Sequence, residues 1–100
     1  MVKHIVMWQF EEGMTIKEQR EYSVKLKEEI EALQAVVPGV EELKVVIDSL
    51  ETSNRHIMLE STFISAQALA DYQVHPAHVA VAQLVGSVTC NRACMDYELI

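Results

Sequence analysis

Glycine and basic residues are scarce in this chain of 100 residues. The three glycines are isolated, so the sequence contains no Gly-rich loop of the kind that binds phosphate groups. Eight Lys and Arg residues stand against fifteen Asp and Glu residues, which gives a formal net charge of −7, and no basic cluster occurs. Because nucleic acids and anionic membranes attract clustered positive charge, we predict that neither is a partner.

Long apolar runs are also missing. No stretch approaches the roughly 18 uninterrupted apolar residues that mark a membrane-spanning helix. The N-terminal run from Met1 to Phe10 lacks both the long apolar segment and the small-residue cleavage site of a secretory signal peptide. If the region that contains Cys90 and Cys94 is a strand, four residue steps separate the two cysteines by roughly 13 Å. A disulfide needs Cα atoms within about 7 Å, so we expect reduced thiols and a cytoplasmic protein.

The length allows one domain, which we place over residues 1–100. A chain of this size buries about two thirds of its surface on folding, enough for one core without disulfides or a structural metal. Half of the residues are hydrophobic, which excludes a disordered chain. That apolar content is large for so small an interior, and it raises the question of whether a second copy covers part of it.

Hydrophobic periodicity and turn residues divide the chain into strands and helices. Thr15 and Glu18 fit a capping box that starts a long helix, and Pro38 with Gly39 ends it. The segment from Val79 to Val88 is apolar around most of a helix, so we expect it to be buried. The predicted strands are residues 2–10, 43–47, 56–63 and 92–99, and the predicted helices are residues 15–37, 65–72 and 75–88. This order predicts an α+β fold, a ferredoxin-like βαββαβ protomer with a four-stranded antiparallel sheet and its helices on one face.

The first strand predicts a homodimer. Its middle, from Ile5 to Trp8, is apolar on both alternating faces, whereas a strand covered on one side alternates apolar and polar residues. The helices of one chain cover only one face of the sheet. Two sheets packed face to face would cover the other and form a dimeric α/β barrel.

Side chains suited to acid–base chemistry gather between Asp71 and His78, and two further histidines lie on the strands predicted to be central. A histidine exchanges protons near neutral pH, and a tyrosine hydroxyl can donate to a developing oxyanion. The candidate site residues are Tyr72, His75, His78, His4 and His56. A structural interpretation stays open beside this one: His78 would satisfy a buried carbonyl, His75 would cap the helix at Pro76, and Tyr72 would belong to the core.

Other chemistries have less support. His75 and His78 could ligate a metal together with His4 or His56 and a carboxylate such as Asp71 or Glu60. The H-x-x-H spacing has no glutamate between the histidines, so we predict no metal site and no cofactor. The sequence also lacks the G-x-S-x-G turn that presents a nucleophilic serine in hydrolases.

Three segments together resemble the stress-responsive A/B barrel domain (Dabb) family across essentially the whole chain. They are His4–Phe10, the Y-x-x-H-P-x-H run from Tyr72 to His78, and the sequence D-Y-E at 96–98. The resemblance implies a ferredoxin-like protomer, a dimeric barrel and a stress-responsive protein, in a family where many members have no known function.

The family includes polyketide cyclases of the olivetolic acid cyclase type, which work without a cofactor. The resemblance implies His78 as the general base and Tyr72 as its hydroxyl partner, with His4, His56 and His75 lining a pocket. The histidine would remove a proton from the carbon beside a carbonyl of a small apolar ligand, before an aldol ring closure. The alternative is a non-enzymatic stress or assembly protein in which the histidine and tyrosine cluster is structural.

Overall fold

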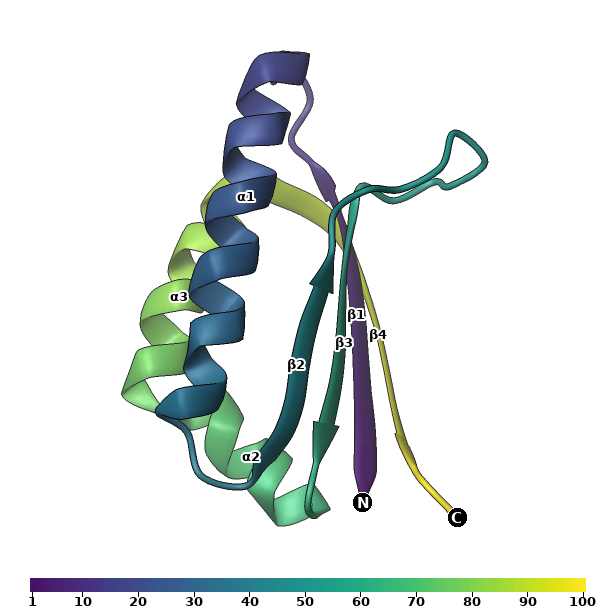
Figure 1. The fold of residues 1–100 in the computed structure, drawn as a ribbon. Coiled ribbons are helices and arrows are strands. Elements are labelled where there is room, and N and C mark those ends of the chain that lie inside the picture. The colour runs from purple at the N-terminus through teal and green to yellow at the C-terminus, as the bar shows by residue number, and fades with distance from the viewer.

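The computed structural model describes residues 1–100 as one four-stranded sheet with three α-helices on one of its faces (Figure 1). The strand order is β2-β3-β1-β4, and every neighbouring pair is antiparallel. The ferredoxin-like fold and its strand–helix order are therefore confirmed. The elements are β1 (Val2–Phe10), α1 (Ile16–Ala32), the short 3-10 helix η1 (Leu33–Ala35), β2 (Val40–Val46), β3 (Ile57–Phe63), α2 (Ala66–Val74), α3 (Pro76–Val88) and β4 (Thr89–Glu98).

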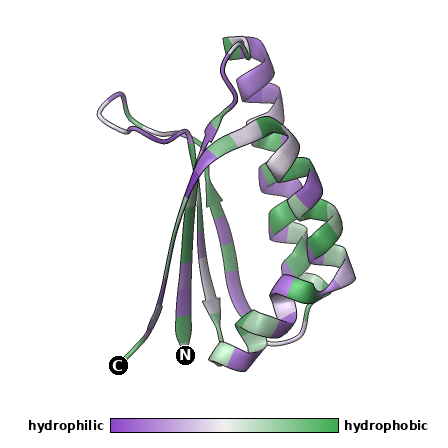
Figure 2. Cartoon of the chain, turned by 180° about the vertical axis from the view of Figure 1, so that it is seen from behind, coloured by the Kyte–Doolittle hydropathy of each residue, from purple (hydrophilic) through white to green (hydrophobic).

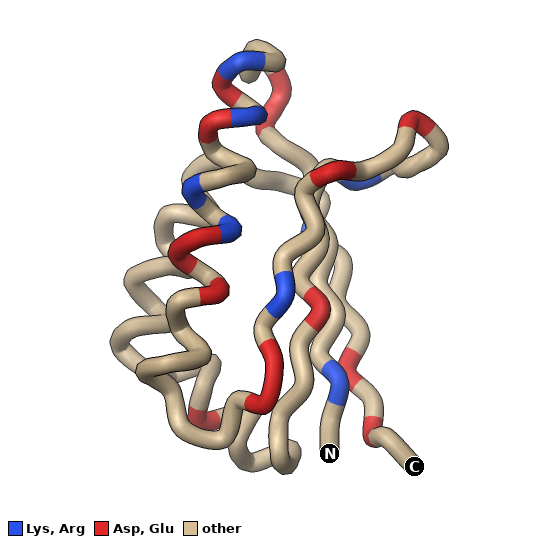
Figure 3. The backbone as a smooth tube through the Cα atoms, viewed as in Figure 1, with Lys and Arg blue, Asp and Glu red and all other residues tan.

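The predicted capping box starts α1. The Thr15 hydroxyl accepts a hydrogen bond from the Glu18 backbone N–H at 3.1 Å, and the Thr15 N–H donates to the Glu18 carboxylate at 3.0 Å. Those two bonds satisfy groups that a helix end otherwise leaves unpaired. Among the charged side chains, many lie on α1 and β2, while α3 carries none (Figure 3).

The core lies between the sheet and the helices (Figure 2). On β1 every second residue is buried toward the helices, beginning at Val2 and including His4, and the residues between them are half-buried on the opposite face. Helix α3 is less buried than its sequence predicts. Val85 and Val88 are buried, but Val79 is 41% exposed, because a helix at the edge of a two-layer fold covers the sheet with one side only.

Side chains of α1 and η1 pair with the free backbone edge of β2. The Lys27 ammonium donates to the Val45 carbonyl oxygen at 2.7 Å, and the Glu31 carboxylate accepts from the Val45 N–H at 2.9 Å. The Gln34 side chain likewise accepts from the Leu43 N–H and donates to the Glu41 carbonyl oxygen. These bonds cover an edge that would otherwise expose unpaired backbone groups, and they hold α1 against the sheet.

The last strand starts three residues earlier than predicted. Strand β4 begins at Thr89, directly after α3, and contains a bulge where Asn91 and Arg92 together lie opposite Trp8 of β1. Asn91 has φ of +52°, in the left-handed region that asparagine tolerates better than most residues. Because the bulge interrupts the alternation of faces, a period-two pattern in the sequence does not detect the strand's first residues.

Candidate functional site

A cavity of about 350 Å³ lies between the sheet and the helices, in the size range of pockets for small molecules. Ten of its sixteen lining residues are hydrophobic, so it suits an apolar ligand body. The lining residues are His4, Val6 and Trp8 of β1, Leu59 of β3, Ile30 and Leu33 from the first helical segment, Tyr72 of α2, His78, Val81, Ala82, Val85 and Gly86 of α3, and Thr89, Cys90, Asn91 and Arg92 of β4.

Tyr72 presents a hydroxyl to this cavity. Its ring is buried between Phe63, with ring centroids 5.0 Å apart, and His78, with centroids 4.3 Å apart. The hydroxyl forms no hydrogen bond within the protein, yet no fully buried side-chain nitrogen or oxygen lacks a partner. The hydroxyl is therefore accessible from the cavity. Burial raises the pKa of Tyr72 to about 12, which keeps it a protonated donor at neutral pH.

His78 lies in the first turn of α3, and a backbone bond fixes its tautomer. Its Nδ1 is 3.0 Å from the carbonyl oxygen of Gln73, which can only accept, so Nδ1 carries the proton. Nε2 is then left with a free lone pair. Burial lowers the pKa of His78, with a smaller effect from nearby positive charge that includes Arg92, and the bond to Gln73 opposes this only in part. A neutral imidazole with an unprotonated Nε2 is the form that a general base requires.

His4 of β1 is 3% exposed and forms a side-chain pair with Asp96 of β4. The two residues are directly opposite each other in the antiparallel pairing of β1 with β4. Because the carboxylate of Asp96 accepts at Nδ1 of His4, the Nε2 of His4 is also the unprotonated nitrogen. Sequence reasoning missed Asp96 as a site residue. The signal was available in the register, since the pairing of the first and last strands brings residue 96 to residue 4.

The other two predicted site residues lie elsewhere. His56 stacks on Phe10, with ring centroids 5.7 Å apart, and its Nδ1 accepts from the Phe10 N–H at 2.9 Å. His75 caps α3, with its Nδ1 accepting from the Ala77 N–H at 3.1 Å. Neither lines the cavity, so the expectation that all four histidines meet in one pocket is corrected: the structure brings together Tyr72, His78 and His4.

The arrangement of possible metal ligands also differs from the one the sequence suggested. The single group of three such side chains is His4, Cys94 and Asp96, whose ligand atoms lie within 4.8 Å of one another. The Cys94 sulfur is 3.8 Å from Nδ1 of His4 and 3.6 Å from the Asp96 carboxylate. These atoms could hold a divalent cation, but they already satisfy one another. His75 and His78 are not part of any such group.

Comparison with known proteins agrees with this architecture. The fold and the helix-covered cavity define an α+β protein of the ferredoxin-like class. Residues 2–99 match the family described as "Stress responsive A/B Barrel Domain" (Dabb), and the chain belongs to this family. A curated relative, the stress-response A/B barrel domain-containing protein HS1 of Arabidopsis thaliana, is 33% identical over 104 residues, covering 97% of this chain and 88% of that protein.

Solved structures give the same result for the fold. A dimeric protein of unknown function and ferredoxin-like fold from Bacteroides fragilis superposes with a TM-score of 0.91 at 31% identity, covering 98% of this chain and 95% of that one. A hydroxynitrile lyase from Passiflora edulis has a TM-score of 0.74 at 20% identity, with 96% and 90% of the two chains covered. At that identity the likeness concerns the fold alone.

Proposed function

We propose that this protein binds a small apolar, carbonyl-containing molecule and performs cofactor-independent acid–base chemistry on it, of the cyclase or isomerase kind. His78 acts as the general base and Tyr72 as the hydroxyl partner. The observation that carries the proposal is the shared cavity, which is lined both by His78, with its unprotonated Nε2, and by Tyr72, with its unbonded hydroxyl. An apolar wall with a few convergent polar groups is typical of ligand sites.

The chemistry follows from the protonation states of these two residues. Nε2 of His78 takes a proton from the carbon beside the ligand carbonyl, and the electrons of that C–H bond move onto the carbonyl oxygen. The Tyr72 hydroxyl donates to the resulting enolate oxygen and stabilises its charge. The imidazolium formed at His78 keeps its Nδ1–H bond to Gln73. The enolate then attacks a second carbonyl of the same molecule to close a ring, or regains the proton at another carbon.

His4 takes a second proton-handling role in this proposal. The Asp96 carboxylate orients the His4 ring, as a carboxylate does for a histidine base in other enzymes. With its unprotonated Nε2, His4 can take up the proton that His78 has removed and pass it to the alkoxide that forms when a ring closes. His75 and His56 stabilise the fold around the site, because their Nδ1 atoms accept hydrogen bonds from backbone N–H groups.

Proton abstraction can be tested without knowing the natural substrate. Incubation with 2-octanone in D₂O, followed by NMR, measures deuterium uptake at the carbons beside the carbonyl. The wild type should accelerate this exchange on the order of 10²-fold over His78→Gln, the usual contribution of a general base. The variant His75→Asn, which keeps a capping side chain, is the matched control and should retain the wild-type rate. A wild-type rate equal to that of buffer would contradict the proposal.

A non-enzymatic role in stress or assembly is the second candidate, and the packing of Tyr72 favours it. Tyr72 is 1% exposed and its ring packs between Phe63 and His78, so the cluster also ties α2 and α3 to the sheet. Under this alternative the Tyr72→Phe variant should keep every measurable property. Under the enzymatic proposal it slows the exchange of 2-octanone, although its packing is unchanged.

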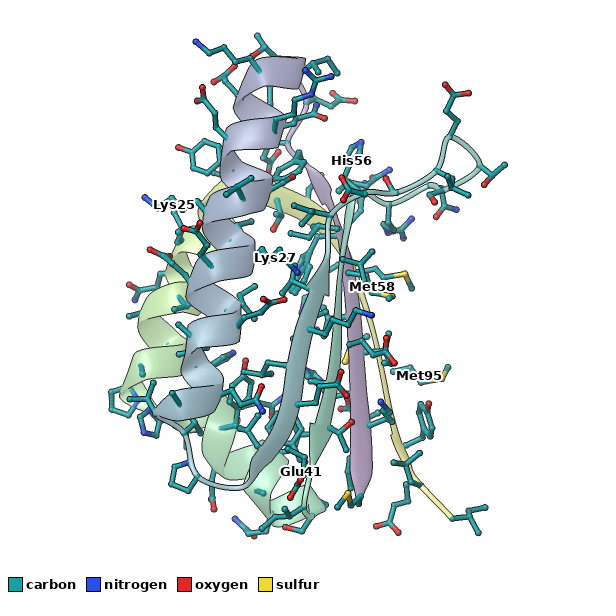
Figure 4. All side chains as sticks on the ribbon, viewed as in Figure 1. Lys25, Lys27, Glu41, His56, Met58 and Met95 are labelled. Carbon is teal, nitrogen blue, oxygen red and sulfur yellow. The ribbon has the colours of Figure 1, made fainter.

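We also propose that two copies pack their sheets face to face into a dimeric α/β barrel. The face of the sheet away from the helices carries Ile5, Met7 and Met58 and the more exposed Met95 and Tyr97. Figure 4 shows Met58 and Met95 pointing away from the helices. An apolar sheet face of this kind marks an interaction surface. The B. fragilis protein of similar structure is dimeric. Light scattering should give twice the 11.3 kDa of one chain, and Met58→Glu should lower the mass toward 11.3 kDa.

The compartment is the last part of the proposal. None of the helices combines the length and the apolarity that crossing a membrane requires. Cys90 and Cys94 are both free thiols. A reducing compartment keeps thiols in this state, which supports a cytoplasmic location. Fractionation of the source cells, followed by immunodetection in the cytosolic fraction, tests it.

A further inference from the structure

The bulge in β4 places a cation at the cavity wall. Between the pairs Met7–Ala93 and Gln9–Cys90, strand β1 contributes only Trp8 while β4 contributes both Asn91 and Arg92. Four consecutive β4 residues, 89–92, consequently line the cavity, although a regular strand presents every second residue to one face. Bulges often re-aim side chains beside functional sites.

Contacts from outside the strand hold this bulge in its left-handed conformation. The Asn91 side chain donates to the side-chain oxygen of Gln9, and the Arg55 guanidinium donates to the Asn91 carbonyl oxygen at 3.0 Å. A non-glycine residue at φ of +52° is uncommon, and its conformation persists where neighbours support it. The placement of Arg92 is thus part of the folded structure and not a property of a loose strand end.

Arg92 has no anionic partner in the protein. The ion pairs of the molecule involve Lys3, His4, Lys17 and Lys27, and none involves Arg92. The carboxylate on its own strand that is closest in sequence, Asp96, is paired with His4. The positive charge of Arg92 nevertheless acts on the cavity, because it contributes to lowering the pKa of His78. In a chain with a net charge of −7, a guanidinium without a carboxylate partner at an apolar cavity is well suited to an anion.

We infer that Arg92 is the anion subsite of this cavity, so that the ligand is an apolar monocarboxylate. Its carboxylate binds the Arg92 guanidinium and its apolar body fills the space toward Val85. This inference rests on the proposed function, because it names the class of molecule that His78 and Tyr72 act on: an oxo-acid whose carbonyl lies at the histidine end. Arg92 is a binding residue here and takes no part in proton transfer.

Trp8 supplies the measurement. It is the only tryptophan, it lines the cavity, and it lies opposite Arg92 across the bulge, so its fluorescence reports entry of a ligand. Octanoate and octanamide are probes of nearly equal shape that differ in charge. Wild-type protein should bind octanoate roughly tenfold more tightly than octanamide, which corresponds to about 1.4 kcal/mol. Sodium chloride at about 0.5 M should weaken the binding of octanoate only.

Substitutions test whether Arg92 is the residue that makes octanoate bind more tightly than octanamide. Arg92→Gln should remove the preference for octanoate and leave the affinity for octanamide unchanged, and Arg92→Lys should keep part of it. Arg20→Gln on α1 makes the same change in net charge on an exposed side chain outside the cavity, and it should bind both probes as the wild type does.

Each outcome of the binding experiment either supports or overturns the anion subsite at Arg92. Equal binding of the two probes by the wild type overturns the anion subsite but leaves the cavity and the proposed function standing. Equal losses for both probes in Arg92→Gln overturn it as well, because they indicate damage to the cavity. Binding of neither probe overturns the anion subsite together with the proposed small-molecule pocket. Failure of the 2-octanone exchange alone, with octanoate preferred, removes the acid–base chemistry and retains Arg92 as a ligand-binding residue.

Discussion

His4 and His78 differ from His56 and His75 in which ring nitrogen the protein occupies. In the first pair Nδ1 donates, to the Asp96 carboxylate and to the Gln73 carbonyl oxygen, so Nε2 is left as a base. In the second pair Nδ1 accepts a backbone N–H, so the proton is on Nε2. One residue type therefore serves two purposes in one small domain, and the hydrogen-bond partner decides which.

The location of the two pairs agrees with this division. His4 and His78 line the cavity, whereas His75 occupies the start of α3 and His56 lies at the start of β3, near the long loop between β2 and β3 (Figure 4). The sequence has four histidines, but only the two with an unprotonated Nε2 line the cavity. Four substitutions or conditions test the division, and they differ in the size of the expected effect.

The largest effect is expected for Asp96→Asn. An asparagine no longer holds Nδ1 of His4 as a donor, so the neutral ring can adopt the other tautomer. Because His4 then no longer takes up the proton from His78, the exchange rate of 2-octanone should fall on the order of 10²-fold, with little change in the melting temperature. Glu98→Gln, an exposed neighbour on the same strand, is the matched control. An undiminished rate in Asp96→Asn would move His4 into the structural pair.

The second largest effect is expected for His56→Ala, which should lower the stability of the fold. It removes the acceptor of the Phe10 N–H and the ring that stacks on Phe10, which costs about 2 kcal/mol. For a domain of this size that corresponds to a melting temperature lower by roughly 10 °C, measurable by circular dichroism. The rate of 2-octanone exchange, corrected for the folded fraction, should stay at the wild-type value. A slower exchange at full folding would place His56 in the site after all.

A smaller effect is expected at the N-terminus of α3. His75→Ala removes the capping acceptor of the Ala77 N–H and should lower the free energy of unfolding by about 1 kcal/mol in urea titrations. His75→Asn supplies another capping side chain and should restore most of that loss. If both variants lose the same stability, the ring of His75 contributes through packing and not through the cap.

The smallest of the four effects is expected in the pH dependence of the exchange rate and of stability, which should distinguish His78 from a histidine with an ordinary pKa. Burial lowers the pKa of His78 below its usual 6.5, so the rate of proton abstraction at pH 6.5 should be more than half of its plateau value. Because the folded pKa lies below the unfolded value, the unfolded chain takes up the proton first. The contribution of His78 to stability is therefore complete above pH 6.5 and is lost as the pH falls through the lower, folded pKa. Urea titrations above and below pH 6.5 should show a smaller acid loss for His78→Gln than for the wild type.

Local patterns account for the parts of the fold that were predicted well. The capping box at Thr15, the proline and glycine after the first helix, and the alternation in β1 each depend on neighbours within a few residues. The approach of Tyr72 to His78 is similarly local, because the two residues are only six positions apart and belong to adjoining helices. These features needed no knowledge of how distant strands pair.

The features that were missed all depend on strand register. Asp96 meets His4 only because β4 pairs with β1 in one register, and a shift of one residue would turn it to the other face. The bulge at Asn91 adds a residue to one strand, which no periodic pattern announces. His56 was placed in the pocket because its strand is central, but it lies just before β3, where its ring reaches the backbone of Phe10.

By itself, the sequence determined an α+β fold, a βαββαβ order and the closeness of Tyr72 in α2 to His78 in α3. Composition, periodicity and capping are sufficient for these because they act within one element or between adjacent ones. The tertiary structure alone decided which histidines keep an unprotonated Nε2, which carboxylate binds one of them, and which cation lines the cavity. Those outcomes depend on hydrogen bonds and registers between β1, β3 and β4, and such partners are chosen only when distant segments pack together.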